Sequence, residues 1–103
     1  MAMNSYYNDT LYPLQDKVLQ TVDNLKTPFY LTGGTALSRC YLQHRYSDDL
    51  DFFVNSEPLF LTHIDAIIAQ LRAEYAVEIL IKSQSYTSLR INNILKVDFM
   101  NDV

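Results

Sequence analysis

Apolar residues recur at helical spacing in two segments of the chain. In the first segment the spacing of three and four predicts an amphipathic helix, with Pro13 accommodated in its opening turn and Thr27-Pro28 as its stop. Its apolar positions are Leu11, Leu14, Val18, Val22 and Leu25. A second helix follows Ser56-Glu57-Pro58 and places on one face Phe60, Ile64, Ile67, Ile68, Leu71 and Tyr75. Both helices are expected to pack on a sheet through these faces.

Other apolar segments have the pattern of strands. Phe29-Tyr30-Leu31 predicts a short buried strand, and Asp49 to Val54 predicts another. From Val77 the period becomes two, which predicts three successive strands with the apolar residues Val77, Ile79, Ile81, Leu89, Ile91, Leu95, Val97 and Phe99. Asn92-Asn93 is expected to be a two-residue hairpin connection between the last two strands, because asparagine tolerates positive φ.

A glycine turn connects the first two expected strands through a further helix. Thr32-Gly33-Gly34-Thr35 predicts the turn, and the apolar side of the helix after it consists of Ala36, Leu37, Cys40 and Tyr41. The element order is therefore helix, strand, helix, strand, helix and three strands. This order predicts an α/β fold with a small mixed β-sheet and helices packed on it, forming a single domain over residues 1–103.

Charge and composition narrow the function classes. Twelve acidic against eight basic side chains give a net charge of −4, which disfavours binding nucleic acid by broad phosphate neutralisation, so any such contact is expected to be local. A single cysteine, Cys40, excludes an internal disulfide, and two distant histidines lack zinc spacing, so we expect a cytoplasmic protein. Neither a membrane partner nor a signal peptide is expected, because no apolar run approaches the ~20 residues of a membrane span.

Three aspartates carry the candidate chemistry. Asp49 and Asp51 project from one face of their strand, about 7 Å apart at Cα, while the apolar side chains between them point the other way. Such a pair could simply end a strand in water, but its neighbours indicate a core strand, where acids are disfavoured unless compensated. Asp98 likewise faces away from the apolar side of the last strand. If the two strands are adjacent, three carboxylates converge.

Such a convergence would need a counter-charge. Two unit charges about 4 Å apart repel by about 4 kcal/mol at an effective dielectric near 20, so the cluster requires a cation or raised pKa values. Oxygen-only ligands favour Mg²⁺. Gly33-Gly34 lets the backbone approach an anion and Thr35 adds a hydroxyl, although a turn of this kind alone is more often a tight turn with Thr32 or Thr35 capping the helix. Together the motifs predict a triphosphate site beside a metal site.

These motifs resemble a known superfamily. Gly33-Gly34-Thr35, Asp49-Leu50-Asp51 and Val97-Asp98-Phe99 resemble the nucleotidyltransferases with the DNA polymerase beta fold, and the runs 31–38 and 44–53 are similar to the AbiEii/AbiGii abortive-infection toxins. The resemblance implies transfer of NMP from an NTP to an acceptor hydroxyl. It implies that Asp49, Asp51 and Asp98 are metal ligands, that two Mg²⁺ ions bind, and that the glycine turn holds the triphosphate.

The resemblance also implies partners. The acceptor in that family includes RNA and the end of tRNA, and a toxin of this kind is usually neutralised by an antitoxin encoded beside it. Asp98, nearest the acceptor by resemblance, is expected to accept the hydroxyl proton. Arg45 either reaches a phosphate or pairs with a neighbouring aspartate, and Lys96 either contacts phosphate or offsets the acid cluster.

The chain departs from the family at its end. Relatives continue into a C-terminal helical region that is absent after Asn101-Asp102-Val103, which leaves open a fragment, a pared-down member, or a site completed by another chain. An apolar surface left open there would favour homo-oligomers. The alternative to an enzyme is a catalytically inert, truncated nucleotidyltransferase-like interaction module. The intact set of three acids favours the enzyme.

Overall fold

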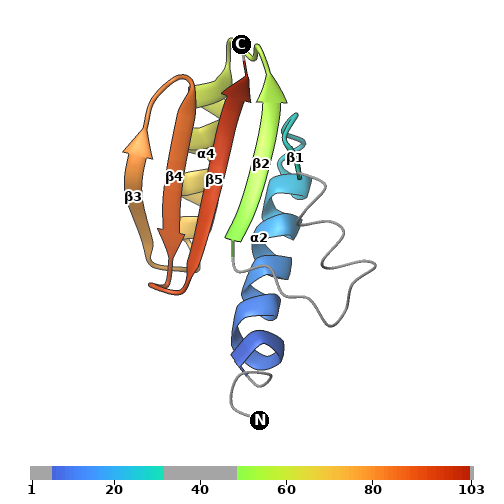
Figure 1. The fold of residues 1–103 in the computed structure, drawn as a ribbon, viewed down its shortest axis with the longest axis vertical. Helices are drawn as coiled ribbons and strands as arrows, with labels where there is room; N and C mark the ends of the chain where they lie inside the picture. Colours follow the sequence, from blue (N-terminus) through green and yellow to red (C-terminus); the bar gives the residue numbers. More distant parts are fainter. Residues whose placement is uncertain (1–5, 32–48, 103) are drawn as a thin grey trace.

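A mixed sheet of five strands forms the centre of this computed structural model, which describes residues 6–31 and 49–102. The strands are β1 (Tyr30–Leu31), β2 (Asp49–Asn55), β3 (Val77–Lys82), β4 (Tyr86–Ile91) and β5 (Leu95–Asp102). Their order is β1-β2-β5-β4-β3, with β2 and β5 parallel and the other neighbours antiparallel (Figure 1). The mixed sheet predicted from the periodicities is thus confirmed.

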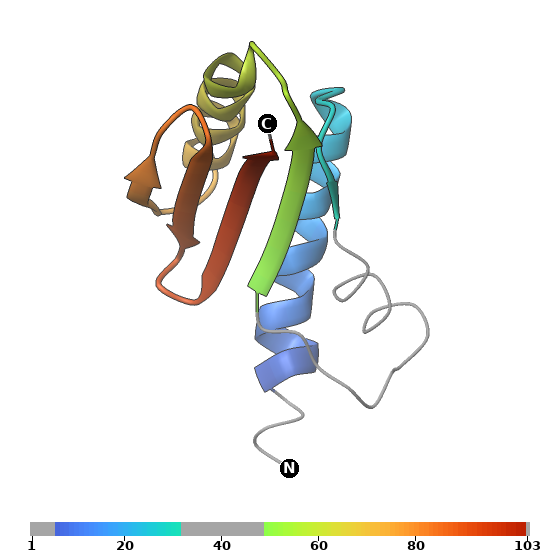
Figure 2. The same cartoon turned by 45° about the horizontal axis from the view of Figure 1, so that its top comes forward.

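Two helices cover one face of this sheet. A short π-helical segment, η1 (Tyr6–Leu11), leads into α2 (Tyr12–Asn24), and α4 (Phe60–Arg72) connects β2 to β3. Both α2 and α4 lie on the same side of the sheet (Figures 1 and 2), and their apolar stripes are buried as the sequence predicted. Leu25 and Tyr75, the last predicted residue of each stripe, lie beyond the helix ends and are only partly buried. Among the described residues, no helix has the length and apolar character needed to span a membrane. The opposite side of the sheet, called here the open face, has no described helix on it.

Aromatic rings join the sheet to the helices. Phe99 on β5 is fully buried and stacks on Phe52 of β2, with ring centroids 5.2 Å apart. Phe29, just before β1, meets Phe99 edge-on at 5.0 Å and Phe60 of α4 at 5.7 Å. These contacts tie β1, β2, β5 and α4 into one core beneath the centre of the sheet.

Asn101 fixes the upper end of the β2–β5 pair. Its side chain is 4% exposed, its Oδ1 accepts the Glu57 N–H at 2.8 Å, and its Nδ2 donates to the carbonyls of Glu57 and Gln84 at 2.9 and 3.1 Å. Because a buried amide is stable only when its hydrogen bonds are made, Asn101 favours the one arrangement in which both loops contact it. The loops after β2 and before β4 are therefore both anchored to β5.

Two expectations about strands are wrong. Instead of a buried strand at Phe29-Tyr30-Leu31, the structure has β1 at the edge of the sheet formed by the described strands. Tyr30 pairs with Phe53 on the open face and is 49% exposed. In β3, Ile79 pairs with Leu89 but Ile81 pairs with Ser88, so a bulge adds one residue and turns Ile81 to the open face. Ile81 is consequently 50% exposed instead of buried.

The β4–β5 connection is one residue longer than expected. Asn92 and Asn93 do adopt positive φ, at 54° and 60°, but Ile91 pairs with Leu95, so Ile94 also belongs to the turn. Pairing Ile91 with Ile94 would have put Leu95 on the open face, away from the core, whereas the observed register buries it fully.

The core predicts a strong contrast between adjacent residues of β5. Phe99→Ala should lower the free energy of unfolding by about 3–5 kcal/mol, since it removes the central ring of the cluster. Met100→Ala, on the open face and 40% exposed, should lower it by less than about 1 kcal/mol. Urea unfolding followed by circular dichroism measures both values. Equal losses would contradict the assignment of the two faces.

Candidate active site

The candidate site lies on the open face of the sheet, at its two parallel strands. Alternation along β2 buries Leu50, Phe52 and Val54 and leaves Asp49 and Asp51 on the other side, as predicted. On β5 the same alternation buries Val97 and Phe99 against the helices. Lys96 and Asp98 therefore share the open face with the two aspartates of β2.

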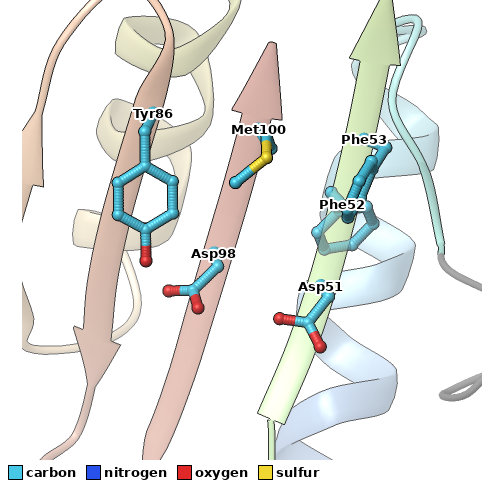
Figure 3. A pocket seen from close by; sticks show the side chains of 6 residues that line it. All are labelled: Asp51, Phe52, Phe53, Tyr86, Asp98 and Met100. Carbon is cyan, nitrogen blue, oxygen red and sulfur yellow. The ribbon is translucent and has the colours of Figure 1, made fainter. Parts of the chain in front are cut away.

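The register of the parallel pair brings two carboxylates together. Asp51 is the register partner of Asp98, and Asp49 is the partner of Lys96. Neighbouring strands are about 4.8 Å apart, so Asp51 and Asp98 extend from adjacent backbone positions. In Figure 3 their carboxylates lie at the same level of the two strands, on the same side. The adjacency of these strands, on which the predicted site depends, is confirmed.

Asp98 is the better-anchored member of the pair. Its side chain is 18% exposed. The Ser88 hydroxyl donates to its Oδ1 at 2.6 Å, and the Lys96 ammonium lies 3.3 Å from its Oδ2. Lys96 thus offsets the negative charge, which is one of the two roles considered from the sequence.

The charges on this face perturb one another. The pKa of Asp51 lies above its ordinary value of 3.8, first because burial penalises the carboxylate and then because Asp98 and Asp49 repel it; Lys96 opposes this effect. The pKa of Lys96 is raised by the nearby carboxylate of Asp98. The face is therefore an electronegative spot that a cation would stabilise.

The donor set fits a hard divalent cation, but the three predicted ligands do not form a ready-made cage. Carboxylate oxygens suit Mg²⁺. Within residues 6–31 and 49–102, however, no group of three or more acidic, histidine or cysteine side chains is arranged to hold a metal ion. Asp51 and Asp98 are adjacent, while Asp49 lies two residues away along β2, opposite Lys96.

A hollow adjoins the two carboxylates. It has a volume of about 320 Å³ and its lining includes Asp51, Asp98, Tyr86 and Met100 (Figure 3). Two residues beyond Asp51 and Asp98 along their strands, a second set of register partners crosses four strands. Its members, in order across the sheet, are Tyr30, Phe53, Met100 and Tyr86. We call these four residues the apolar row. The site thus consists of Asp51 and Asp98, which we call the acidic row, beside the apolar row.

The other half of the predicted site lies outside the described residues. Gly33, Gly34 and Thr35, the expected triphosphate turn, and Arg45 fall in the segment 32–48. The further helix predicted after the turn, with Cys40 and Tyr41, falls there too. Their roles stay predictions.

Sequence reasoning missed Ser88 and Tyr86 as members of this face. The signal was available in the hairpin, because the register of β4 against β5 decides which residue lies opposite Asp98. A two-residue connection would have placed Thr87 there, whereas the observed three-residue turn places Ser88 there. The apolar positions of β4 and β5 are compatible with the latter register alone.

The fold and this site define a class of protein. JHP933 from Helicobacter pylori, a solved structure, is similar to the chain with a TM-score of 0.56 and 21% identity, over 84% of this chain and 42% of JHP933. A second H. pylori structure, of a protein provisionally named a nucleotidyltransferase, has a TM-score of 0.55 and 21% identity, over 82% of this chain and 43% of that one. The fold is that of the nucleotidyltransferases.

The family can be stated more closely. The model of the AbiEii nucleotidyl transferase toxin family, of type IV toxin-antitoxin systems, matches residues 17–100. The chain belongs to the AbiEii family, which confirms the resemblance seen in the motifs. No curated protein sequence matches the chain. The chain spans less than half the length of the two H. pylori structures.

Burial of the Asp51 carboxylate, together with repulsion from Asp98 and Asp49, predicts a variant that is more stable than the wild type. A carboxyl whose pKa is higher in the folded protein opposes folding once pH exceeds its unfolded value near 3.8. Asp51→Asn should therefore raise the free energy of unfolding at pH 7, and the gain should vanish as pH falls below about 4. Urea titrations at both pH values measure this difference.

Asp102→Asn is the matched control for that measurement. It removes the same charge from the exposed end of β5, away from the acidic row. It should change the pH 7 value little. A loss of stability in Asp51→Asn at pH 7 would contradict the repulsion between these carboxylates.

Proposed function

We propose that this chain is the catalytic core of a metal-dependent nucleotidyltransferase that transfers NMP from an NTP to an acceptor hydroxyl. The observation that carries the proposal is the register pairing of Asp51 with Asp98, which places two carboxylates side by side on an open face. Membership of the AbiEii family supports the reaction class. The electronegative environment of Asp51 supports the binding of a cation.

Asp51 and Asp98 would hold magnesium, with Asp49 as the third ligand after a change of its side-chain rotamer. Two Mg²⁺ ions, when bound, would stabilise the charge that develops on the attacking and leaving oxygens. The backbone of the two adjacent strands fixes the separation of the Cα atoms of Asp51 and Asp98, so only their side chains have to be ordered at the moment of reaction. The strand pair therefore acts as a rigid template.

Transfer of NMP requires one group that accepts the proton of the acceptor hydroxyl. The acceptor oxygen forms a bond to the α-phosphorus of the NTP while the bond from that phosphorus to the pyrophosphate oxygen breaks. Pyrophosphate leaves with the bonding electrons. Asp98 accepts the proton of the acceptor hydroxyl on Oδ2, the oxygen that does not accept from Ser88.

Binding of the triphosphate is assigned to the glycine turn and to basic side chains. The amides of Gly33 and Gly34 and the hydroxyl of Thr35 would bind the β- and γ-phosphates. Arg45 would add a positive charge there. Lys96, whose side chain is 42% exposed, can turn from Asp98 toward a phosphate, and Asp98 then keeps the hydrogen bond from Ser88.

The biological setting follows from the family description. An AbiEii toxin of a type IV system implies a cognate antitoxin, and an RNA acceptor such as the end of tRNA fits a net charge that permits only local polyanion contact. A cytoplasmic location fits the single cysteine.

Loss of one carboxylate should abolish transfer. Asp51→Asn and Asp98→Asn should each lower the rate of label transfer from α-³²P-labelled NTPs to bulk tRNA by at least about 100-fold, because even groups that only support a metal ligand contribute 10–100-fold. Asp102→Asn should retain wild-type activity. Full activity in Asp51→Asn would remove the metal role from this account.

A binding measurement separates the enzyme from an inert interaction module. With Mg²⁺ and an NTP at 100 times the dissociation constant, the folded state should gain about 2.7 kcal/mol, visible as a rise in Tm. Asp51→Asn should lose that rise. No rise with any of the four NTPs in the wild type would favour the inert module.

The apolar row predicts self-association. Tyr30 and Met100 are 49% and 40% exposed, which leaves apolar surface in contact with water on the open face. Light scattering at increasing concentration should show dimers or larger species, and Met100→Lys should shift them toward the monomer. A monodisperse wild-type monomer at high concentration would contradict the homo-oligomer.

A further inference from the structure

Ser88 on β4 directly contacts Asp98 of the acidic row. It is the antiparallel register partner of Asp98, and it is 1% exposed. Its Oγ lies 2.6 Å from Oδ1 of Asp98, within the range of a charge-assisted O–H···O⁻ hydrogen bond. Since an ionised carboxylate has no proton to give, the serine hydroxyl must be the donor.

We propose that Ser88 is a positioning residue that holds Asp98 in one rotamer and reserves its Oδ2 for the metal and the acceptor hydroxyl. The inference rests on the proposed function, because it assigns Asp98 to the reacting groups. It extends that function to a residue outside the motifs of the sequence.

The two contacts of Asp98 differ in how firmly they can hold it. Lys96 has a long side chain that is 42% exposed, and ion pairs made by exposed side chains are weakened by water and salt. Ser88 has a short side chain on a strand paired on both sides, and water hardly reaches it. The hydrogen bond from Ser88 is therefore the persistent restraint, while Lys96 can leave.

The hydrogen bond also makes the two oxygens of Asp98 unequal. Oδ1 accepts the hydrogen bond from the buried hydroxyl of Ser88. Oδ2 is therefore the oxygen on the exposed side, where the ammonium of Lys96 lies. Asp51 is on the strand beyond Asp98. A carboxylate held in this way presents one defined oxygen next to a second carboxylate, which is what a bridging cation requires.

The chain offers a matched control on the same strand. Thr87, next to Ser88, also carries a buried hydroxyl, with 0% exposure, but it lies on the helix-covered side and contacts the Ser83 carbonyl at 3.5 Å. Thr87→Val deletes a hydroxyl of equal burial without touching Asp98. Ser88→Ala deletes the proposed donor.

The experiment measures the Asp98 rotamer and metal binding in the same proteins. Three-bond NMR couplings report χ1 of Asp98, and Mn²⁺ alone, titrated by electron paramagnetic resonance, reports metal affinity. The wild type and Thr87→Val should show one χ1 rotamer and similar Mn²⁺ affinity. Ser88→Ala should show averaged χ1 couplings and about tenfold weaker Mn²⁺ binding. Ser88→Thr, which keeps the hydroxyl, should restore both.

Each outcome decides the inference. Unchanged χ1 couplings in Ser88→Ala, or averaged couplings with unaltered Mn²⁺ affinity, would overturn it. If Ser88→Ala does not fold, Ser88→Cys applies the same test, because cysteine has a similar size and is a weaker donor. If the wild type binds no Mn²⁺, the proposed function fails, and the couplings alone then decide whether Ser88 holds Asp98.

Discussion

The parallel pairing of β2 with β5 is the constraint on which the rest of the site depends. Leu50, Phe52, Val97 and Phe99 form the buried underside of this pair. They fix its register because a slip of either strand by one residue would turn the two apolar residues of that strand to the open face. The same register determines the upper side. Asp51 therefore lies beside Asp98 because of the apolar residues between and around them, not because the two carboxylates attract one another.

The repulsion on the open face is balanced by neighbouring groups of the same sheet. Lys96 and Ser88 each contact one oxygen of Asp98, whereas burial and two carboxylates raise the pKa of Asp51. The core stabilises the fold from the other side, through the ring cluster at Phe99 and the anchoring amide of Asn101. A well-packed core thus holds carboxylates that repel one another close together on the open face, which lowers the stability of the fold. Such an arrangement is expected at a site where a bound cation or substrate offsets the negative charge.

Features that follow from hydrophobic periodicity, namely the faces of strands and helices, could be predicted from the sequence. Features that depend on strand register and on bulges could not. The faces of Asp49, Asp51 and Asp98 follow from strict alternation, and the amphipathic helices follow from their stripes, so these were predicted correctly. Ile81 was placed in the core because no periodicity reveals an inserted residue in an edge strand. The sequence does not reveal Ser88, because the Asn92-Asn93 connection is one residue longer than its pattern predicts and a single residue decides which hydroxyl lies opposite Asp98. Both errors concern pairing between strands, which local pattern specifies only in part.

The position of a bound cation tests the account most directly. Crystals of the chain grown with Mn²⁺ and a non-hydrolysable NTP analogue would locate the metal by its anomalous scattering. We predict an anomalous peak within coordination distance of the carboxylates of both Asp51 and Asp98, with Ser88 still hydrogen-bonded to Asp98. A metal bound elsewhere, with these two carboxylates directed apart, would contradict it.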